Sequence, residues 1–166
     1  EFKTIVLYTT RPIRAGEQDG VEYHFVKEET LKAFEEKGQI IELRAYNTVH
    51  GVWKYFTADD GQVDLKQGNY LGIGTLESYV KMREYYGAEA LCPVYIEVED
   101  GERLERALKR EQSQITPRYA EMCRRFLNDQ ADFSEENIAS AGIMRRFQND
   151  DLDRCVGEII GYIKSF

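Results

Sequence analysis

The sequence is poor in cysteine and proline and has no long apolar run. Its 166 residues include three cysteines, Cys92, Cys123 and Cys155, which lie far apart and form no CxxC pair. An odd, scattered set argues against a disulfide framework, so we expect small buried thiols in a protein of the reducing cytoplasm. No apolar stretch approaches the roughly 20 residues of a membrane span, and no signal peptide is recognisable. We therefore expect no membrane partner.

The chain also lacks an excess of positive charge, because its formal net charge at pH 7 is −8. Binding to nucleic acid through counterion release needs a broad basic surface, so this balance argues against a nucleic-acid partner. The charge is uneven, however. The window Arg103–Arg125 holds seven basic residues against three acidic ones, and Arg11 and Arg14 form a second basic cluster near the start. Two arginine clusters in an acidic protein indicate sites for a small, highly charged anion.

Apolar segments alternate along the chain in a pattern typical of an α/β protein with a parallel sheet. We expect apolar strands at 2–8, 70–75, 91–99 and 143–148, and helices at 30–37, 76–87, 101–111, 117–131 and 149–163. The segment 40–57 alternates apolar and polar residues around a break, which predicts antiparallel strands with one face in water. In that segment Glu42 and Arg44 should share a face.

One stretch near the start, TTRPIRAGEQDGVEYHFV (Thr9–Val26), places two arginines around a proline-stiffened turn and follows them with an aromatic cluster. It resembles the guanylate kinase signature TTRxPRxGExxGxxYxFV, and only the proline is displaced, to Pro12. The segments FEEKGQIIE, VHGVWKYFT, RALKR, CRRF and FQNDDLD continue the resemblance in register along most of the chain.

The resemblance implies a three-layer α/β fold of the P-loop kinase type, with a parallel sheet flanked by helices, a small antiparallel monophosphate-binding insert and a helical lid. It implies a single domain over residues 1–166. Its regions would be a core at about 1–9, 69–104 and 141–166, a monophosphate-binding region at about 10–68 and a lid at about 105–125. The implied reaction moves the γ-phosphoryl group of ATP to GMP and gives GDP and ADP.

The residues that the resemblance assigns to substrate binding are Arg11, Arg14, Tyr23, Glu42, Tyr55 and Thr57. Planar guanidinium groups can grip the phosphate bidentately, and the two tyrosine hydroxyls can donate to the same group. The Glu42 carboxylate can accept the N1–H and N2–H₂ donors of guanine, whereas it would repel the bare N1 acceptor of adenine. An alternative reading is that Arg11 and Arg14 only form surface salt bridges with Glu17 or Asp19.

On the ATP side the resemblance implies that Arg106, Arg110 and Arg125 close over the transferring phosphoryl group. An ordinary amphipathic helix with an arginine-rich wet face is the alternative. Asn149 matches a position that contacts the adenine of ATP, although it could equally cap a helix. Mg²⁺ would be held by ATP and a P-loop. The chain itself offers no evident metal site, because His24 and His50 are too few for zinc without neighbouring cysteines.

The sequence departs from the family pattern at three places. It contains no GxxxxGK[ST] loop, and we expect that roughly 20–25 residues carrying it precede Glu1. Gly72 and Gly74 stand where the family has two aspartates that serve the base and the metal, and Leu7 replaces a serine that contacts guanine. Two alternatives to a guanylate kinase therefore stay open. One is a catalytically inactive module that binds a phospholigand, and the other is a kinase for another nucleoside monophosphate.

Overall fold

The structure, a computed structural model, describes residues 1–48 and 51–166. These residues divide into two compact units, Glu1–Ala90 and Leu91–Phe166. The single-domain organisation and its region boundaries stay predictions. Among the described helices, none combines the length and the apolar character needed to cross a membrane.

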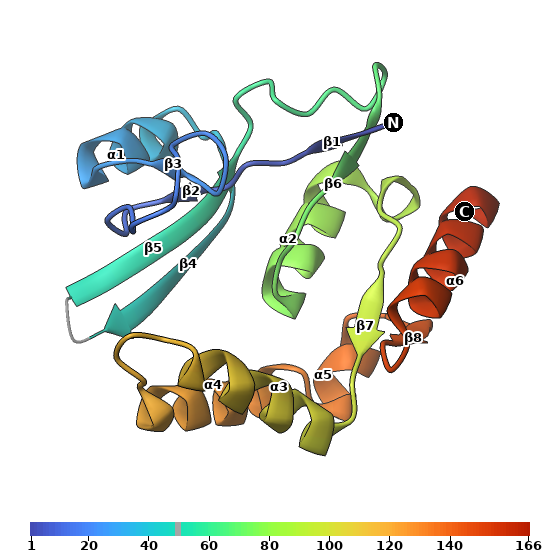
Figure 1. Cartoon of the computed structure of the whole chain (residues 1–166). Coiled ribbons are helices and arrows are strands. Elements are labelled where there is room, and N and C mark those ends of the chain that lie inside the picture. The colour runs from blue at the N-terminus through green and yellow to red at the C-terminus, as the bar shows by residue number, and fades with distance from the viewer. Residues whose placement is uncertain (49–50) are drawn as a thin grey trace. The chain divides into compact units, whose positions relative to one another are not determined.

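The first unit is built on a four-stranded sheet of order β3-β2-β5-β4 (Figure 1). Its strands are β2 (Tyr8–Thr9), β3 (His24–Phe25), β4 (Ile40–Thr48) and β5 (Gly51–Ala58). β4 and β5 run antiparallel, and β5 also pairs antiparallel with β2, which is parallel to β3. The predicted antiparallel strands are confirmed, and Val49 and His50 of the predicted break lie outside the described residues.

The core of this unit lies where helix α1 (Glu28–Glu36) meets the sheet. Leu31, Phe56 and Ala58 are buried there, and the Tyr8 ring stacks on Phe56 with centroids 4.9 Å apart. Burying each of the two larger side chains contributes about 1.5–3 kcal/mol. The helix ends at Glu36, one residue before the predicted end, and Gly38 follows with φ +66°, a left-handed conformation that suits glycine.

A second, two-stranded sheet in the first unit pairs β1 (Phe2–Thr4) with β6 (Asn69–Leu71) in parallel. The prediction of one buried strand over 2–8 is wrong, because β1 is exposed and the chain changes sheets after it. The Ile5 amide still donates to the Leu71 carbonyl, but β2 then pairs with β3 and β5. The predicted strand at 70–75 likewise shrinks to β6, and the chain continues into α2 (Leu76–Tyr86) and the 3₁₀ turn η1 (Ala88–Ala90).

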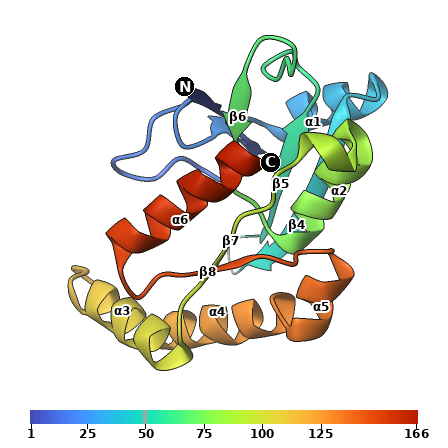
Figure 2. The same cartoon turned by 90° about the vertical axis from the view of Figure 1, so that its right-hand side faces the viewer.

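The second unit pairs β7 with β8 in parallel, places α3 beside α4 and packs α6 against β8 (Figure 2). Its elements are β7 (Tyr95–Glu97), α3 (Asp100–Gln112), α4 (Tyr119–Asp132), α5 (Glu135–Ser140), β8 (Arg146–Gln148) and α6 (Leu152–Ser165). β7 is shorter than the predicted strand over 91–99 and begins two residues after Pro93, which has no N–H to pair. β8 is also shorter than predicted. The parallel pairing is confirmed.

Helix caps explain where the helices of the second unit begin. Asp151 caps α6 by accepting the Arg154 amide at 2.8 Å, so the alternative role of Asn149 as the cap of this helix is wrong. Helix α5 was missed in the sequence, although Ser134 gives the usual signal because its hydroxyl accepts the Asn137 amide at 3.3 Å.

The three cysteines differ in exposure. All three are free thiols, as expected, and Cys155 is the buried residue of α6. The prediction that all are buried is wrong for Cys123, which is exposed on α4, and Cys92 is half-buried. The scattered spacing of the cysteines therefore predicted correctly that they form no disulfide bond, but it did not predict which of them are buried.

Candidate functional site

The arginine loop, Thr9–Val26, is fixed to strand β5 at its start. The buried Thr9 hydroxyl donates to the Lys54 carbonyl at 2.9 Å and accepts the Arg11 amide at 3.1 Å. Thr10 completes the attachment, because its amide donates to the Lys54 carbonyl and its hydroxyl accepts the Lys54 amide, each at 3.0 Å. The two threonines before the first arginine thus hold the loop to the sheet.

Arg11 is enclosed rather than presented to solvent. Only 3% of its surface is exposed, and its two terminal nitrogens donate to the two carboxylate oxygens of Glu17 at 2.9 Å each. Its guanidinium also lies 5.4 Å from the ring centre of Tyr23 and 5.3 Å from that of Phe25. The hydrogen bonds that Arg11 donates to Glu17 raise the pKa of Arg11, and the same bonds lower the pKa of Glu17. The ion pair between Arg11 and Glu17 that was considered as an alternative therefore exists, but its arginine is buried, its glutamate is half-buried, and the pair shapes the loop.

Arg14 is the exposed arginine of the loop. Its amide donates to Glu17 at 2.8 Å, while its guanidinium lies 6.0 Å from the ring centre of Trp53. Among residues 1–48 and 51–166, no ion pair joins this guanidinium to an acid. Gly16, with φ +87°, makes the tight turn that brings Glu17 back under the loop. Arg14 is consequently available to an incoming anion.

The two predicted tyrosines come together at this loop. The rings of Tyr23 and Tyr55 lie 5.6 Å apart in an edge arrangement, and the Tyr55 ring is 5.7 Å from that of Tyr46. Tyr55 is opposite Thr9 on one side of β5 and opposite Arg44 on the other. The structure thus gathers Arg11, Tyr23 and Tyr55, while Arg14 is exposed on the same loop near Trp53.

Glu42 forms the second polar cluster of the first unit, together with Thr57 and Arg44. The Thr57 hydroxyl donates to Oε1 of Glu42 at 2.8 Å, and Arg44 donates to Oε2 at 2.8 Å and to Oε1 at 3.2 Å. Glu42 and Thr57 are 3% and 1% exposed. Burial lowers the pKa of the Arg44 guanidinium, but the hydrogen bond and charge of Glu42 outweigh it and the pKa is raised. The predicted shared face of Glu42 and Arg44 is confirmed, whereas the involvement of Arg44 in the cluster was missed.

The two glycines that replace the acids of the family pattern follow β6. A side chain built on Gly74 would place its Cβ 2.8 Å from the hydroxyl of Ser78, which is itself buried in the first turn of α2. An aspartate at this position would therefore require Ser78 to move. Gly72 would place a Cβ at an ordinary 3.5 Å from Ile5.

In the second unit, Arg106 and Arg110 lie four residues apart on α3 and therefore on one face. Arg106 pairs with Glu102 and donates to the Asn149 carbonyl at 2.8 Å, so the structure brings these two predicted residues together. Arg110 is exposed in the last turn of α3. The amide of Asn149 donates to the Glu97 carbonyl at 2.8 Å, which ties the residue to the end of β7.

Arg125 lies on α4 and pairs with Glu121 of the same helix at 2.9 Å. Glu121 also accepts two hydrogen bonds from Arg124, at 2.7 Å each. The bonds from Arg124, followed by those from Arg125, lower the pKa of Glu121 to about 2. One acid thus holds both arginines on the exposed side of the helix.

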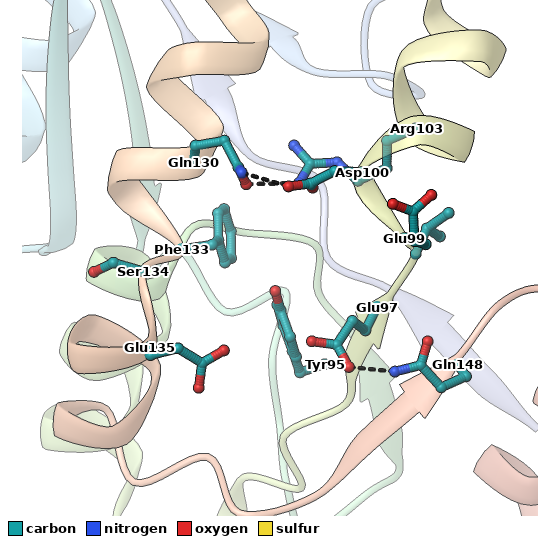
Figure 3. A pocket seen from close by; sticks show the side chains of 11 residues that line it. Tyr95, Glu97, Glu99, Asp100, Arg103, Gln130, Phe133, Ser134, Glu135 and Gln148 are labelled. Carbon is teal, nitrogen blue, oxygen red and sulfur yellow. Dashed lines mark hydrogen bonds and ion pairs between the residues drawn. The ribbon is translucent and has the colours of Figure 1, made fainter.

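The second unit also contains a cavity of about 560 Å³ beside β7 (Figure 3). The stacked rings of Tyr95 and Phe133, 5.9 Å apart, form one wall. Four carboxylates face it, from Glu97, Glu99, Asp100 and Glu135. Each carboxylate already accepts hydrogen bonds from neighbouring groups. This acidic lining disfavours a phosphate, so the cavity is not assigned to a nucleotide phosphate.

The described residues include no group of three or more His, Cys, Asp or Glu side chains that could hold a metal ion. His24 packs its ring 4.7 Å from Tyr8, and His50 lies outside the described residues.

Comparison with known proteins gives concordant matches. The family model described as guanylate kinase matches residues 1–53. The guanylate kinase of Chlorobaculum tepidum is 30% identical over 162 residues, which cover 95% of this chain and 76% of that protein. The guanylate kinase of Vibrio vulnificus is 41% identical over 64 residues, but these cover 36% of this chain and 31% of that enzyme. The matched part of this chain thus spans about a third of the length of the Vibrio vulnificus enzyme.

A solved structure, guanylate kinase from Anaplasma phagocytophilum, superposes with a TM-score of 0.62 over 99% of this chain and 75% of that chain, at 19% identity. This likeness confirms the predicted α/β fold of the P-loop kinase type.

Proposed function

Because this chain belongs to the guanylate kinase family, we propose that it transfers the γ-phosphoryl group of ATP to GMP, giving GDP and ADP. The observation that carries the proposal is the arrangement of two polar clusters on one sheet. Tyr55 and Thr57 point to the same face of β5, two residues apart, and Glu42 and Arg44 stand opposite them on β4. Two residues along a strand span about 7 Å, so a phosphate at Tyr55 and a base at Glu42 can belong to one mononucleotide.

The phosphate of GMP would be held by Arg14, Tyr23 and Tyr55. Arg14 is exposed on a loop whose base is fixed to β5, so little freedom is lost when it binds an anion. Its guanidinium can donate two parallel hydrogen bonds to phosphate oxygens. Arg11 lies behind this group, and its positive charge adds to the attraction although Glu17 takes up part of its donor capacity.

The base would be read by Glu42 and Thr57. A buried carboxylate accepts hydrogen bonds from guanine and meets the N1 lone pair of adenine with repulsion, so it selects against adenine. Leu7, Gly72 and Gly74 contribute no polar side chain to this recognition. Base selection therefore depends mainly on the cluster around Glu42.

Arg106, Arg110 and Arg125 of the second unit are assigned to the charge of the transferring phosphoryl group, and Asn149 to the adenine of ATP. Phosphoryl transfer needs positioning and charge neutralisation more than covalent chemistry from the protein. Arg106 and Arg125 are held by Glu102 and Glu121 in exposed ion pairs, which contribute little and exchange readily for a phosphate.

ATP is the second substrate in this proposal, and Mg²⁺ would arrive with it. The described residues offer no cluster that fits a metal, so no residue of this chain is assigned to Mg²⁺. The 166 residues contain no GxxxxGK[ST] loop, and turnover would depend on one. A cytoplasmic location and the absence of nucleic-acid and membrane partners belong to the same proposal.

The test is GMP-dependent formation of ADP from Mg-ATP by the complete gene product. We expect turnover that needs GMP and that falls strongly in the Arg14→Met variant. Lys81→Met, which removes an exposed cation on α2, should leave turnover unchanged. No turnover above background from a protein that carries a P-loop would reject the proposal.

A second candidate is a catalytically silent module of the same family that binds a phospholigand. It is favoured by Gly72 and Gly74, because the acids that serve base and metal in the family pattern are replaced. Binding of a phosphoserine peptide that is lost in Arg14→Met, without any kinase activity, would establish this function instead.

A further inference from the structure

The carboxylate of Glu42, which the proposed function assigns to base recognition, is already engaged by a neighbour on the same strand. Arg44 holds it with a fork of two donors, from Nε to Oε2 at 2.8 Å and from Nη2 to Oε1 at 3.2 Å. The side chains of Glu42 and Arg44 are 1% and 10% exposed, so water does not compete effectively for either group. This fork uses the same two oxygens that guanine would approach.

The acceptor capacity of the carboxylate can be counted. An ionised carboxylate has roughly four lone-pair sites on its two oxygens. Oε1 accepts from Thr57 and from Arg44, and Oε2 accepts from Arg44 alone. The carboxylate therefore retains one acceptor site, on Oε2. A guanine base offers two donors on this edge, N1–H and the 2-amino group, and only one of them can be accommodated.

Arg44 is unlike a flexible surface arginine that a ligand displaces at little cost. Moving it away would leave a carboxylate buried without a countercharge, which is strongly unfavourable. The fork is also supported by the strand geometry, because Glu42 and Arg44 are two residues apart on the same face of β4. The pair is thus part of the folded sheet and not a transient contact.

We propose that Arg44 determines the base selectivity of the monophosphate site by restricting Glu42 to a single hydrogen bond with the base. The substrate class is then a 6-oxopurine nucleoside monophosphate, in which N1–H is read and the 2-amino group is not. IMP, which has N1–H but no 2-amino group, should bind nearly as well as GMP. AMP is rejected, because its N1 is an acceptor and faces the remaining lone pair of Oε2.

The inference rests on the proposed function, and the first experiment separates the two. Isothermal titration of the 166-residue chain with GMP, IMP and AMP gives three values of Kd. We expect IMP and GMP to agree within about fivefold, because a second hydrogen bond to a charged group would separate them by about tenfold or more. A GMP preference above fivefold overturns the inference and leaves the function standing. Failure of all three nucleotides to bind overturns both.

The second experiment changes Arg44. In Arg44→Met the fork is removed, both oxygens of Glu42 can accept from guanine, and the preference for GMP over IMP should rise by about tenfold or more. Arg44→Lys keeps the charge but cannot span both oxygens, so we expect a smaller rise. Lys81→Met, an exposed change on α2, should leave the ratio unaltered.

Circular dichroism shows whether each variant is folded. An unchanged ratio in folded Arg44→Met shows that Arg44 has only a structural role and overturns the inference. If Arg44→Met does not fold, the GMP preference over IMP is compared between Arg44→Lys and the wild type. A merely structural Arg44 would leave this preference at its wild-type value in Arg44→Lys, and that result overturns the inference.

Discussion

The ion pair between Glu42 and Arg44 makes a quantitative prediction about stability. The Glu42 side chain is almost completely desolvated and the Arg44 side chain largely so. Removing one partner of a buried pair costs about 3–5 kcal/mol, and the partial exposure of Arg44 favours the lower end. We therefore expect Glu42→Gln and Arg44→Met each to lose about 3 kcal/mol of unfolding free energy. For a chain of this size that loss lowers Tm by roughly 6–12 °C.

The double variant distinguishes this pair from two independent sites. With both charges removed, the main remaining defect is the amide N–H₂ of the new glutamine, which costs about 1–3 kcal/mol if it stays unpaired. We thus expect the loss of unfolding free energy in the double variant to be no larger than the loss in each single variant. Two independent sites would instead add up to a loss of roughly 6 kcal/mol.

Urea unfolding followed by the fluorescence of Trp53 provides the assay, because this is the single tryptophan and it lies in β5 of the same sheet. The exposed pair of Lys81 and Glu84 on α2 is the matched control, and replacing it should cause no measurable change. Additive losses in the double variant, or single losses below about 1 kcal/mol, would refute the reasoning from burial.

Three further predictions concern the loop, the core and the second unit. Arg14→Met should weaken GMP binding by about tenfold or more in calorimetry, because a charge-assisted contact to phosphate is lost, and an unchanged Kd would contradict the assignment of the exposed arginine. Phe56→Ala should lower the unfolding free energy by about 3–5 kcal/mol in urea titration, because the side chain is fully buried under Tyr8, and a loss below 1 kcal/mol would place the core elsewhere. Glu121 should titrate near pH 2 by carboxyl NMR instead of at its ordinary 4.5, so its contribution to stability is present above pH 4.5 and is lost as the pH falls toward 2. A midpoint near 4.5 would show that its bonds to Arg124 and Arg125 do not persist in solution.

The sequence carried enough information to predict the arginine loop and the antiparallel strands. Alternation along 40–57 correctly placed Glu42 and Arg44 on one face of β4. The prediction that this face lies in water is wrong at Glu42, which is only 3% exposed. The predicted end of the first helix at residue 37 is close to the observed end of α1 at Glu36, and Gly38 after it adopts the left-handed conformation typical of a helix end.

Other features depend on tertiary contacts that a linear pattern does not contain. The strand lengths of β1, β6, β7 and β8 are set by where a partner strand runs alongside, which composition does not encode. The burial of Arg11 required Glu17 to fold back beneath it through Gly16. The fork that Arg44 makes to Glu42 depends on the burial of both side chains in the folded protein. Helix α5 was the exception, since Ser134 gave a capping signal that was available in the sequence.

The central claim, that the arginine loop and the Glu42 cluster bind a nucleoside monophosphate, is tested most directly by the fluorescence of Trp53 during titration with GMP and with guanosine. The Arg14 guanidinium lies 6.0 Å from the centre of the Trp53 ring, so a phosphate that draws Arg14 away changes the surroundings of the indole. The account predicts a saturable change with GMP, a much weaker response to guanosine, and loss of the GMP response in Arg14→Met. Equal responses to GMP and guanosine, or none to either, would contradict it.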